Sequence, residues 1–488
     1  MIEGLLTALS PLSLLWTLIG TAGGVVVGAI PGLGGGMLMV LALPLTFAME
    51  PIDAILLLIG IHIGSVSGGM ISATLLRMPG TPSSLITTLD GHPMAEAGRA
   101  ERALNLGIGS SLVGGLFAGI VLITLAPTLS LWALTFGPWE LAALVLMALV
   151  LVAAISAGTM ILGLISAALG VAAALPGISP SDGQTRLTFG FDDMVAGFQL
   201  LPVLLGVFVI SQLFKEVTKQ SDAAVIISVG KFGDTPKMRE WWKQGRNLLR
   251  SSTIGTLVGI LPGAGASISS MVAYAVARSV SKTPERFGTG FDDGVVASES
   301  ANNANIGGAL VPLVTLGIPG APVDAILLGA MVMHELQPGP LLFLNNGDLV
   351  WAMMIGYFIA NVMMFVLMFA SYRHIAKIIN ISSHFLVPVV FVLCVIGSYS
   401  VGNRMFDVWV MLGFGVLGYF LDRARVPLGP FVIGFVLATP FETELRTALQ
   451  LSDGSLLGIV NHPVAMVLVF IALGMLVAPH LRSRPREA

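Results

Sequence analysis

Charge is scarce in this chain. Only 10% of its 488 residues are Asp, Glu, Lys or Arg, whereas 55% are hydrophobic and the mean hydropathy is +0.91. A soluble protein of this length needs far more charge on its surface. A spanning helix needs roughly 20 apolar residues, and the sequence predicts an all-α polytopic integral membrane protein. None of the four charged residue types occurs in residues 4–49, 103–139, 141–181, 194–214, 251–277, 378–403 and 454–481.

Several functional signatures are also missing. The single cysteine, Cys394, cannot form an internal disulfide and is expected to pack against lipid or a helix. His334 and Glu335 lack the second histidine of a zinc-binding HExxH helix, so we reject a metal site there. No phosphate-binding G-x-x-x-x-G-K-[ST] loop occurs, which argues against an ATP-driven pump. The start of the chain has neither a basic region nor a small-residue cleavage site, so we expect no removable signal peptide.

Basic residues are concentrated in one segment. Eight of the 24 Lys and Arg residues lie between Lys215 and Arg250, and more follow in the C-terminal "RSRPRE". The positive-inside rule places both segments in the cytoplasm and favours an outside N-terminus. A nucleic-acid surface is a much weaker explanation, and no nucleic-acid partner is expected. We therefore divide the chain into residues 1–214, a basic cytoplasmic linker 215–250, and residues 251–488.

The two halves share a pair of motifs in the same order. "VGAIPGLGGGMLMV" around Pro31 resembles "VGILPGAGASISSM" around Pro262, and both read V-G-x-x-P-G-x-G. Further on, "SGGMISATLLRMPGTPSSL" matches "IGGALVPLVTLGIPGAPVDA" in its Gly-Gly pair and its Pro-Gly-x-Pro. The paired prolines are 48 residues apart from Pro31 to Pro79 and 57 apart from Pro262 to Pro319. This order predicts two internally repeated halves, expected to be inverted.

Breaks of this kind mark a secondary transporter when they occur at matching positions. Proline removes a backbone donor, and glycine permits a tight turn. Freed backbone groups are tolerated in a membrane only inside the protein or beside a watery cavity. For any single break, the alternative to a binding site is a simple helix kink with close packing. We predict substrate contacts from the broken or re-entrant helices at Pro31, Gly32, Gly34, Thr81, Ser83, Ser84, Gly263, Ser267, Ser300, Asn302, Asn303, Pro319 and Gly320.

The stretch "ESANNANIGG" is polar within an apolar region. Amide and hydroxyl oxygens can coordinate a small cation, and their N–H and O–H groups can hold a carboxylate. We predict that Glu299, Asn302, Asn303 and Asn305 contact the coupling ion, with a possible Na⁺ at Asn302 and Asn303. The alternatives are helix capping for the hydroxyls and a boundary position for Glu299.

Three further residues have two interpretations each. Asp324 follows the Pro-Gly-Ala-Pro break and is a candidate like Glu299. His62 lies in an apolar span, where it either binds and titrates or is a packing histidine. Arg77 precedes Pro79 and either meets an anion or extends to the membrane interface.

The apolar segments suggest roughly 11–13 crossings, fewer where a hairpin re-enters without crossing. The candidates lie near residues 9–29, 53–76, 103–126, 137–156, 158–175, 198–214, 251–280, 303–333, 349–371, 385–401, 405–421, 427–440 and 461–480.

Long motifs carry a family resemblance. "MPGTPSSLITTLDGHPMAEAGRAERAL", "GILPGAGASISS" and "ESANNANIGGALVPLVTLGIPGAPVDAILLGAMVMHELQPGPLLF" closely resemble the large membrane subunit of tripartite tricarboxylate transporters, the TctA family. So do "TFGFDDMVAGFQLLPVLLGVF" and "VPLGPFVIGFVLATPFETELRTAL", and the matches run from about Val25 to Leu449. Two departures stand out: "HIGSVSGGMISATLLR" replaces a form rich in Tyr, Gly and Ser, and "APVDA" has an aspartate where a small or hydroxyl residue is expected.

The resemblance implies a multi-pass carrier of the bacterial inner membrane. Its expected partners are a small membrane subunit (TctB-like) and a periplasmic solute-binding protein (TctC-like) that delivers a carboxylate. Import would be driven by a gradient of Na⁺ or H⁺, with no other cofactor. The substrate is left open among tricarboxylates, dicarboxylates and aromatic acids.

Two alternatives remain. One is a stand-alone ion-coupled carboxylate carrier that needs no binding protein. The other is an intramembrane hydrolase, which would need a nucleophile and a base inside the membrane. "GAGAS" at Ser267 is the nearest nucleophile motif, but no well-placed partner histidine is evident, so we expect no enzyme.

Overall fold

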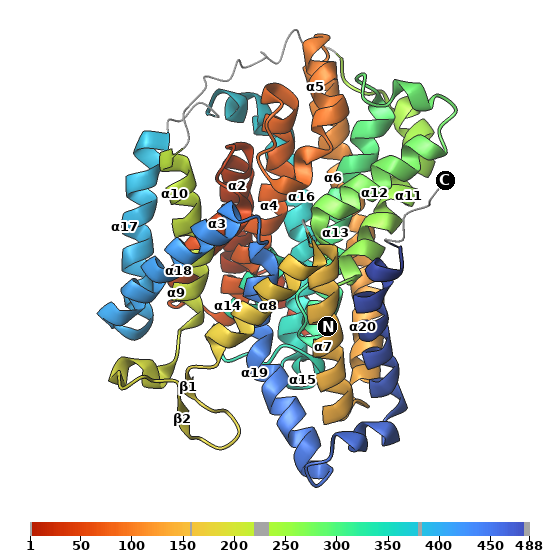
Figure 1. Ribbon diagram of the computed structural model, residues 1–488. Coiled ribbons are helices and arrows are strands. Elements are labelled where there is room, and N and C mark those ends of the chain that lie inside the picture. The colour runs from red at the N-terminus through yellow and green to blue at the C-terminus, as the bar shows by residue number, and fades with distance from the viewer. Residues whose placement is uncertain (1, 157–158, 219–233, 379–382, 483–488) are drawn as a thin grey trace, which may run out of the picture. The chain divides into compact units, whose positions relative to one another are not determined.

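A computed structural model describes residues 2–156, 159–218, 234–378 and 383–482 (Figure 1). The chain forms two compact units, each built from a stretch on either side of the basic linker. Unit 1 comprises Met1–Ser130 and Gln212–Ser400, and unit 2 comprises Leu131–Ser211 and Val401–Ala488. Part of the predicted linker, residues 219–233, and most of "RSRPRE" lie outside the described residues.

Unit 1 holds all four predicted breaks. Its elements are α1 (Ile2–Ala8), α2 (Pro11–Ala29), α3 (Gly35–Thr46), α4 (Pro51–Leu76), η1 (Pro82–Leu85), α5 (Thr88–Glu96), α6 (Ala100–Ala133), α10 (Ser211–Thr218), α11 (Met238–Ile260), α12 (Gly265–Ser279), η4 (Pro284–Arg286), α13 (Asp292–Leu316), α14 (Pro322–Met333), α15 (Pro340–Asn345), α16 (Gly347–Ile378) and α17 (Ser383–Gly402).

Unit 2 is smaller. Its elements are α7 (Pro138–Ile155), α8 (Met160–Ala174), β1 (Gly177–Ile178), β2 (Thr185–Arg186), η2 (Asp192–Ala196), α9 (Leu200–Leu204), the π-helical η3 (Leu205–Ile210), α18 (Met405–Arg423), α19 (Leu428–Leu451), η5 (Leu456–Asn461) and α20 (Pro463–Arg482). The two short strands pair antiparallel, with Gly177 opposite Arg186. Arg186 also donates to both carboxylate oxygens of Glu442 at 2.5 and 2.6 Å, which anchors this hairpin to α19.

The prediction of a helical, multi-pass membrane protein is confirmed. Among the described residues, eight helices are long and apolar enough to cross a membrane, and five shorter apolar helices accompany them. The expected spans at 251–280 and 303–333 are each divided by a break, into α11 and α12 and into α13 and α14. The number of crossings and the repetition of the halves stay predictions.

Glycine permits the close packing of α4 in unit 1. The membrane-length part of α4 is fully buried, and α4 packs along α2 (red to orange in Figure 1). A methyl group built on Gly20 would lie 2.1 Å from the carbonyl oxygen of Leu57, and one on Gly64 would lie 2.3 Å from that of Thr21. Small residues on both helices therefore allow backbone contact, as in other membrane helix pairs.

The same kind of contact joins α11 to α13, which lie side by side (green in Figure 1). A methyl group on Gly255 would lie 2.4 Å from the carbonyl oxygen of Ala301, and one on Gly308 would lie 2.3 Å from that of Thr256. Each half of the chain thus supplies one glycine-packed helix pair to unit 1.

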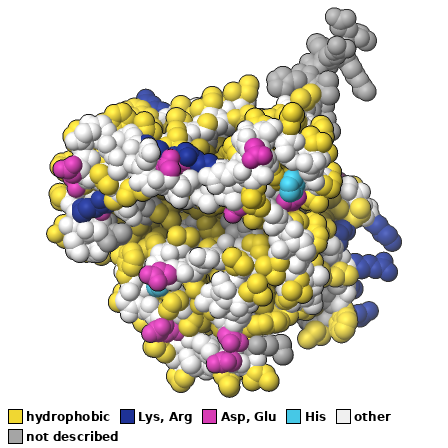
Figure 2. All heavy atoms as spheres, turned by 90° about the horizontal axis from the view of Figure 1, so that it is seen from below, with side chains coloured by type: hydrophobic (Ala, Val, Ile, Leu, Met, Phe, Trp, Pro, Cys, Tyr) yellow, Lys and Arg dark blue, Asp and Glu magenta, His cyan; other side chains and the backbone are white. Residues whose placement is uncertain are grey.

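Large hydrophobic side chains remain exposed along helix faces. On α16, Val362, Val366 and Phe369 are each about half exposed and follow helical spacing. Figure 2 shows a face on which hydrophobic side chains are widespread and charged side chains form separate small groups. Such surfaces are unfavourable in water and suit contact with lipid.

Candidate functional site

The four breaks arise from local sequence. Ile30 and Leu261 each precede a proline and are extended, with ψ of 115° and 119°. A following proline pushes its predecessor out of the helical region, which ends α2 and α11 there. In contrast, α4 and α13 each end at a residue in the left-handed backbone conformation, Arg77 with φ 57° and Gly317 with φ 68°. Glycine adopts this conformation without penalty, whereas arginine does so rarely.

The breaks meet in pairs. The backbone N–H of Gly263 donates to the carbonyl oxygen of Gly320 at 2.7 Å, which joins the two breaks of the second half. In the first half, a methyl group on Gly80 would lie 1.9 Å from the carbonyl oxygen of Gly28. A methyl group on Gly36 would meet Val323 at 3.4 Å, so the start of α3 also contacts the first turn of α14. The N-termini of several helices that follow the breaks, including α3 and α14, therefore lie close together in unit 1.

The hydroxyl groups of the first half lie at one of these N-termini. Thr81, Ser83 and Ser84 are buried at the start of η1. Thr81 Oγ1 lies 3.0 Å from Ser83 Oγ, and Ser84 Oγ donates to the carbonyl oxygen of Thr81 at 2.9 Å. These contacts are those of a helix cap, and the role of the hydroxyls in substrate binding stays a prediction.

Glu299 is fully buried within α13. Thr87 donates a hydrogen bond to its Oε1, and Ser111 of α6 lies 3.4 Å from its Oε2 as a second donor. Thr87 Oγ1 also lies 3.2 Å from Ser298 Oγ. The carboxyl group is thus held by two hydroxyls from the first half of the sequence.

The three predicted asparagines differ in their bonding. Asn303 Oδ1 accepts from Ser67 Oγ of α4 at 2.7 Å, and Asn305 Nδ2 donates to Ser269 Oγ of α12 at 2.6 Å. Asn302 is fully buried, but neither its Nδ2 nor its Oδ1 makes a hydrogen bond of normal geometry, although the amide lies near the Glu299 carboxyl. An unpaired buried amide is costly and is free to contact a ligand.

The remaining predicted residues are more scattered. Ser300 is buried, and its hydroxyl donates to the carbonyl oxygen of Val296 at 2.7 Å. Pro319 is buried beside Gly320 in the α13–α14 break. The other four residues are half-buried, at the first break of each half of the sequence: Pro31, Gly32, Gly34 and Ser267. Arg77 is exposed and makes no ion pair of 4 Å or less with a described residue.

His62 and Asp324 lie together. Both are buried, on α4 and in the first turn of α14, and His62 Nδ1 lies 3.7 Å from Asp324 Oδ1. The sequence marked each residue as a separate candidate, because nothing in it indicates that positions 62 and 324 meet.

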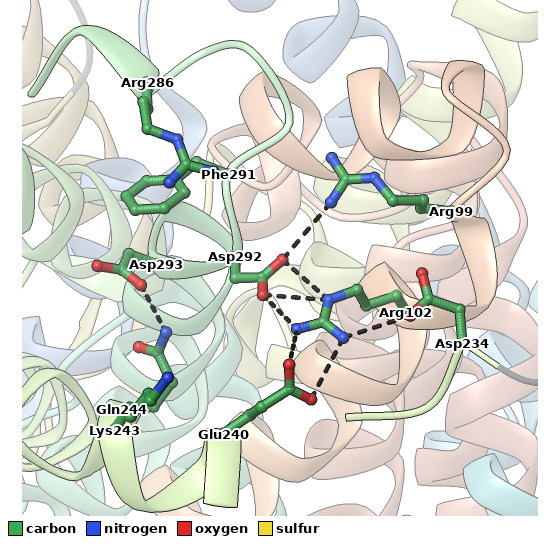
Figure 3. Close-up of a pocket in the computed structure, with 10 residues that line it drawn as sticks. All are labelled: Arg99, Arg102, Asp234, Glu240, Lys243, Gln244, Arg286, Phe291, Asp292 and Asp293. Atoms are coloured by element: carbon green, nitrogen blue, oxygen red, sulfur yellow. Dashed lines mark hydrogen bonds and ion pairs between the residues drawn. The ribbon is translucent and has the colours of Figure 1, made fainter. Parts of the chain in front are cut away.

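A charged pocket was not predicted. It measures about 450 Å³ and is lined by Arg99, Arg102, Asp234, Glu240, Lys243, Gln244, Arg286, Phe291, Asp292 and Asp293 (Figure 3). Arg102 lies between three carboxylates, 2.6 Å from Asp292, 3.0 Å from Glu240 and 3.3 Å from Asp234. Its guanidinium lowers the pKa of the Glu240 carboxyl below the usual range.

Four basic and four acidic side chains line this pocket, so their formal charges cancel. Carboxylates already surround Arg102, and Arg286 lies over the ring of Phe291 at 4.2 Å. The pocket therefore fits an ion-pair network better than an anion site. Through Arg102, the network connects Asp234 of the linker to the starts of α6, α11 and α13. The dense charge in "GRAER" and "FDD" is the sequence signal that could have located it.

Apolar spanning helices and paired helix breaks define a multi-pass membrane protein of the transporter class. Residues 14–433 match the Tripartite tricarboxylate transporter TctA family. The chain belongs to this family, which makes it the TctA-type membrane component of a tripartite transport system, a transport protein and not an enzyme.

Two proteins of Agrobacterium vitis are similar to this chain. One, described as an "Uncharacterized 52.8 kDa protein in TAR-I ttuC' 3'region", is 32% identical over 485 residues, covering 99% of this chain and 96% of the relative. The other, an "Uncharacterized protein in TAR-II ttuC' 3'region", is 35% identical over 233 residues, covering 47% of this chain and 96% of the relative. No solved structure matches.

Proposed function

We propose that this protein imports a carboxylate across the bacterial inner membrane by symport with an ion. A periplasmic solute-binding protein delivers the substrate, and a small membrane subunit completes the assembly. The observation that carries the proposal is that the helix breaks meet in pairs within unit 1, and the fully buried amide of Asn302, which makes no hydrogen bond of normal geometry, adds a candidate ligand contact. Membership of the TctA family supports the partners and the carboxylate class.

Helix N-termini supply the attraction for a carboxylate. α3, η1, α12 and α14 each begin just after a break, and their first N–H groups carry partial positive charge. The hydroxyls of Thr81, Ser83, Ser84 and Ser267 and the amides of Asn302 and Asn303 are our candidates for direct contacts. Their hydrogen-bond donors suit an anionic substrate.

Oxygen atoms near Glu299 supply a site for a coupling ion. Its carboxyl lies among hydroxyls, and Asn303 and Asn305 carry amide oxygens on the same helix. Carboxylate, amide and hydroxyl oxygens are suitable ligands for a small hard cation such as Na⁺. We therefore keep Glu299, Asn302, Asn303 and Asn305 as the proposed ion contacts.

The paired geometry favours two repeats, which we propose are inverted. α2 and α11 end in the same extended turn, with Ile30 N–H bonded to Val27 O and Leu261 N–H bonded to Val258 O, both at 3.1 Å. α4 and α13 both end in a left-handed residue. By analogy with other carriers, unit 1 would be the part that moves during transport.

The linker favours one orientation. Its basic residues place it in the cytoplasm by the positive-inside rule. The charged pocket includes Asp234 and Glu240 of this segment, so it would lie at the same face and hold the linker against unit 1.

Uptake of radiolabelled citrate, tartrate and an aromatic acid into proteoliposomes tests this function. The vesicles would contain the full chain with its small membrane subunit, with and without the binding protein and an ion gradient. Uptake that needs the binding protein and a gradient supports the tripartite importer. Uptake without the binding protein favours the stand-alone carrier, and no uptake of any carboxylate contradicts the proposal.

A further inference from the structure

Asp324 is a buried carboxyl group that makes no hydrogen bond of normal geometry. Its exposed fraction is 0%, and neither oxygen meets a described donor at normal geometry, although the backbone N–H of Ala321, the N-cap residue of α14, lies near the carboxyl. The nearest oppositely chargeable group is the imidazole of His62, with Nδ1 at 3.7 Å from Oδ1. That distance is too long for a hydrogen bond and short enough for an ion pair once the histidine is protonated.

Helix capping accounts for Asp324 only in part, because its contact with the N–H of Ala321 is not of normal hydrogen-bond geometry. It is the third residue of α14, after an N-terminal proline, where an acidic side chain often bonds a backbone N–H. Asp53 holds the equivalent position in α4, also two residues after a proline, and there the carboxylate accepts a hydrogen bond from Ser13 at 2.6 Å. Asp324 has the same local sequence setting but no such hydroxyl donor, so its side chain is available for another role.

A bare carboxylate is expensive in this environment. Burying an unpaired charge costs several kcal/mol, and intramembrane carboxylates are kept for function. One proton makes the His62–Asp324 pair neutral, either as imidazole with carboxylic acid or as imidazolium with carboxylate. Losing that proton leaves a single negative charge. The pair therefore exchanges between a neutral state and an anionic state by gaining or losing one proton.

No other described charged group forms an ion pair with these two side chains. The main neighbours of α4 and α14 include α2, α3 and η1, which carry no titratable side chain. The other elements packed against α4 and α14, and α4 itself, do carry titratable groups. Those whose side chains are described are Asp53, Asp90, His92, Glu96, Asp292, Asp293, Glu299, Asp348, Tyr357, Tyr372, Arg373 and His374, with Arg77 at the end of α4. Asp53, Asp90 and Glu299 are held by hydroxyl donors of their own.

The geometry points to the His62–Asp324 pair as a proton-binding site that couples carboxylate import to the proton gradient. This inference rests on the proposed import of a carboxylate and adds a second ion site to the one around Glu299. A proton from the outer water binds Nδ1 or the carboxylate and later leaves to the cytoplasm, and no other bond changes.

Electrostatics link the proton to the substrate. Asp324 lies in the first turn of α14, directly after the Pro319–Pro322 break. A negative charge there offsets the positive N-terminus of α14 and opposes a carboxylate substrate. Protonation removes that charge, so the proton and the substrate each favour binding of the other, as reciprocal linkage requires.

Transport by matched variants tests the site. The full chain, its small subunit and the binding protein would be assayed with radiolabelled citrate, tartrate and an aromatic acid in sodium-free proteoliposomes at clamped membrane potential. One coupled proton lets a gradient of about one pH unit sustain about tenfold accumulation. We expect Asp324→Asn to lose this accumulation while retaining exchange of labelled for unlabelled substrate. Asp53→Asn, with the same residue type and helix position, should accumulate substrate as the wild type does.

Protonation of Asp324 can be measured directly, without any transport assay, so the proton site can be tested independently of the proposed function. Infrared pH-difference spectra of the full chain in lipid should contain a titrating carboxylic acid band that Asp324→Asn removes and Asp53→Asn leaves. His62→Gln should shift the pH midpoint at which that band titrates. This second variant keeps the test possible if Asp324→Asn proves unstable.

The outcomes are distinct. Wild-type accumulation by Asp324→Asn, a band that does not titrate, or uptake driven by Na⁺ and indifferent to the pH gradient would each overturn the proton site. A titrating band assigned to Asp324, with no uptake of any carboxylate, would instead support the proton site while contradicting the proposed import.

Discussion

Asn302 and Asn303 are consecutive and fully buried on α13, yet only Asn303 makes a side-chain hydrogen bond of normal geometry. Asn303 joins α13 to α4 through Ser67, whereas the amide of Asn302 makes no hydrogen bond of normal geometry. A buried amide without partners costs stability, so a contact with a ligand would give Asn302 a reason to be there. We therefore predict that Asn303 also supports the fold, whereas Asn302 serves only the proposed site.

Alanine substitution should distinguish the two. Asn302→Ala should reduce carboxylate uptake about tenfold or more, because a lost hydrogen bond to a charged group costs about 1.5–3 kcal/mol. It should leave thermal stability unchanged or slightly higher. Asn303→Ala should also reduce uptake, and it should destabilise the protein by about 1–3 kcal/mol because Ser67 loses its partner.

Both variants would be measured for membrane abundance, uptake and thermal unfolding in lipid nanodiscs. Wild-type uptake by Asn302→Ala at normal abundance would remove Asn302 from the site. Equal stability losses in the two variants would show that Asn302 is bonded after all.

Close backbone contact between the breaks should be sensitive to a single methyl group. Gly80→Ala places a carbon 1.9 Å from the carbonyl oxygen of Gly28, so the two breaks must separate. Overpacking of this kind costs about 1–3 kcal/mol, and we expect lower thermal stability and lower uptake together. Gly245→Ala is the control, because it lies in α11 with open space around it and should be neutral or stabilising by about 0.5–1 kcal/mol. Similar unfolding temperatures for the two variants would contradict the contact.

The sequence predicted the breaks well because their causes are local. Proline excludes the helical conformation from the residue before it, so the breaks at Pro31 and Pro262 could be predicted, although the expected span 251–280 ran across the second one. The polar content of "ESANNANIGG" likewise directed attention to Glu299 and its neighbours. Both are properties of short segments.

The missed features depend on contacts between distant segments. His62 and Asp324 were separate candidates, and each lies in one of the two departures noted from the family pattern. Only the packing of α4 against α14 places them 3.7 Å apart. The pocket around Arg102 required three distant acidic residues to meet. The division into units could not be read along the chain, because each unit combines stretches from both sides of the linker.

Restoring a continuous helix should impair transport without preventing insertion. Pro262→Ala removes the residue that forces Leu261 out of the helical region, so α11 would extend toward α12. We expect normal membrane abundance and a large loss of uptake, measured in proteoliposomes. Pro127→Ala is a matched control, since Pro127 lies inside α6 without breaking it. A Pro262→Ala protein with full uptake would show that the break is only a kink.

The ion-pair network should make stability depend on acid pH. Arg102 holds the pKa of Glu240 below the ordinary value of 4.5, so the ionised Glu240 stabilises the folded protein. This contribution is fully present above the ordinary pKa and is lost as the pH falls through the lower, folded-state pKa. Glu240→Gln keeps an acceptor for the backbone N–H of Lys237, which Glu240 binds at 2.7 Å, and removes only the charge.

Thermal unfolding should therefore show Glu240→Gln less stable than the wild type at neutral pH. The difference should persist down to the ordinary pKa of a glutamate and shrink below it, because the wild-type carboxylate is then protonated as well. Glu285→Gln removes an exposed carboxylate that makes no described ion pair, so it should leave the unfolding temperature unchanged at every pH. A Glu240→Gln difference that stays constant into acid would mean that the bond to Lys237, rather than the charge beside Arg102, carries the effect.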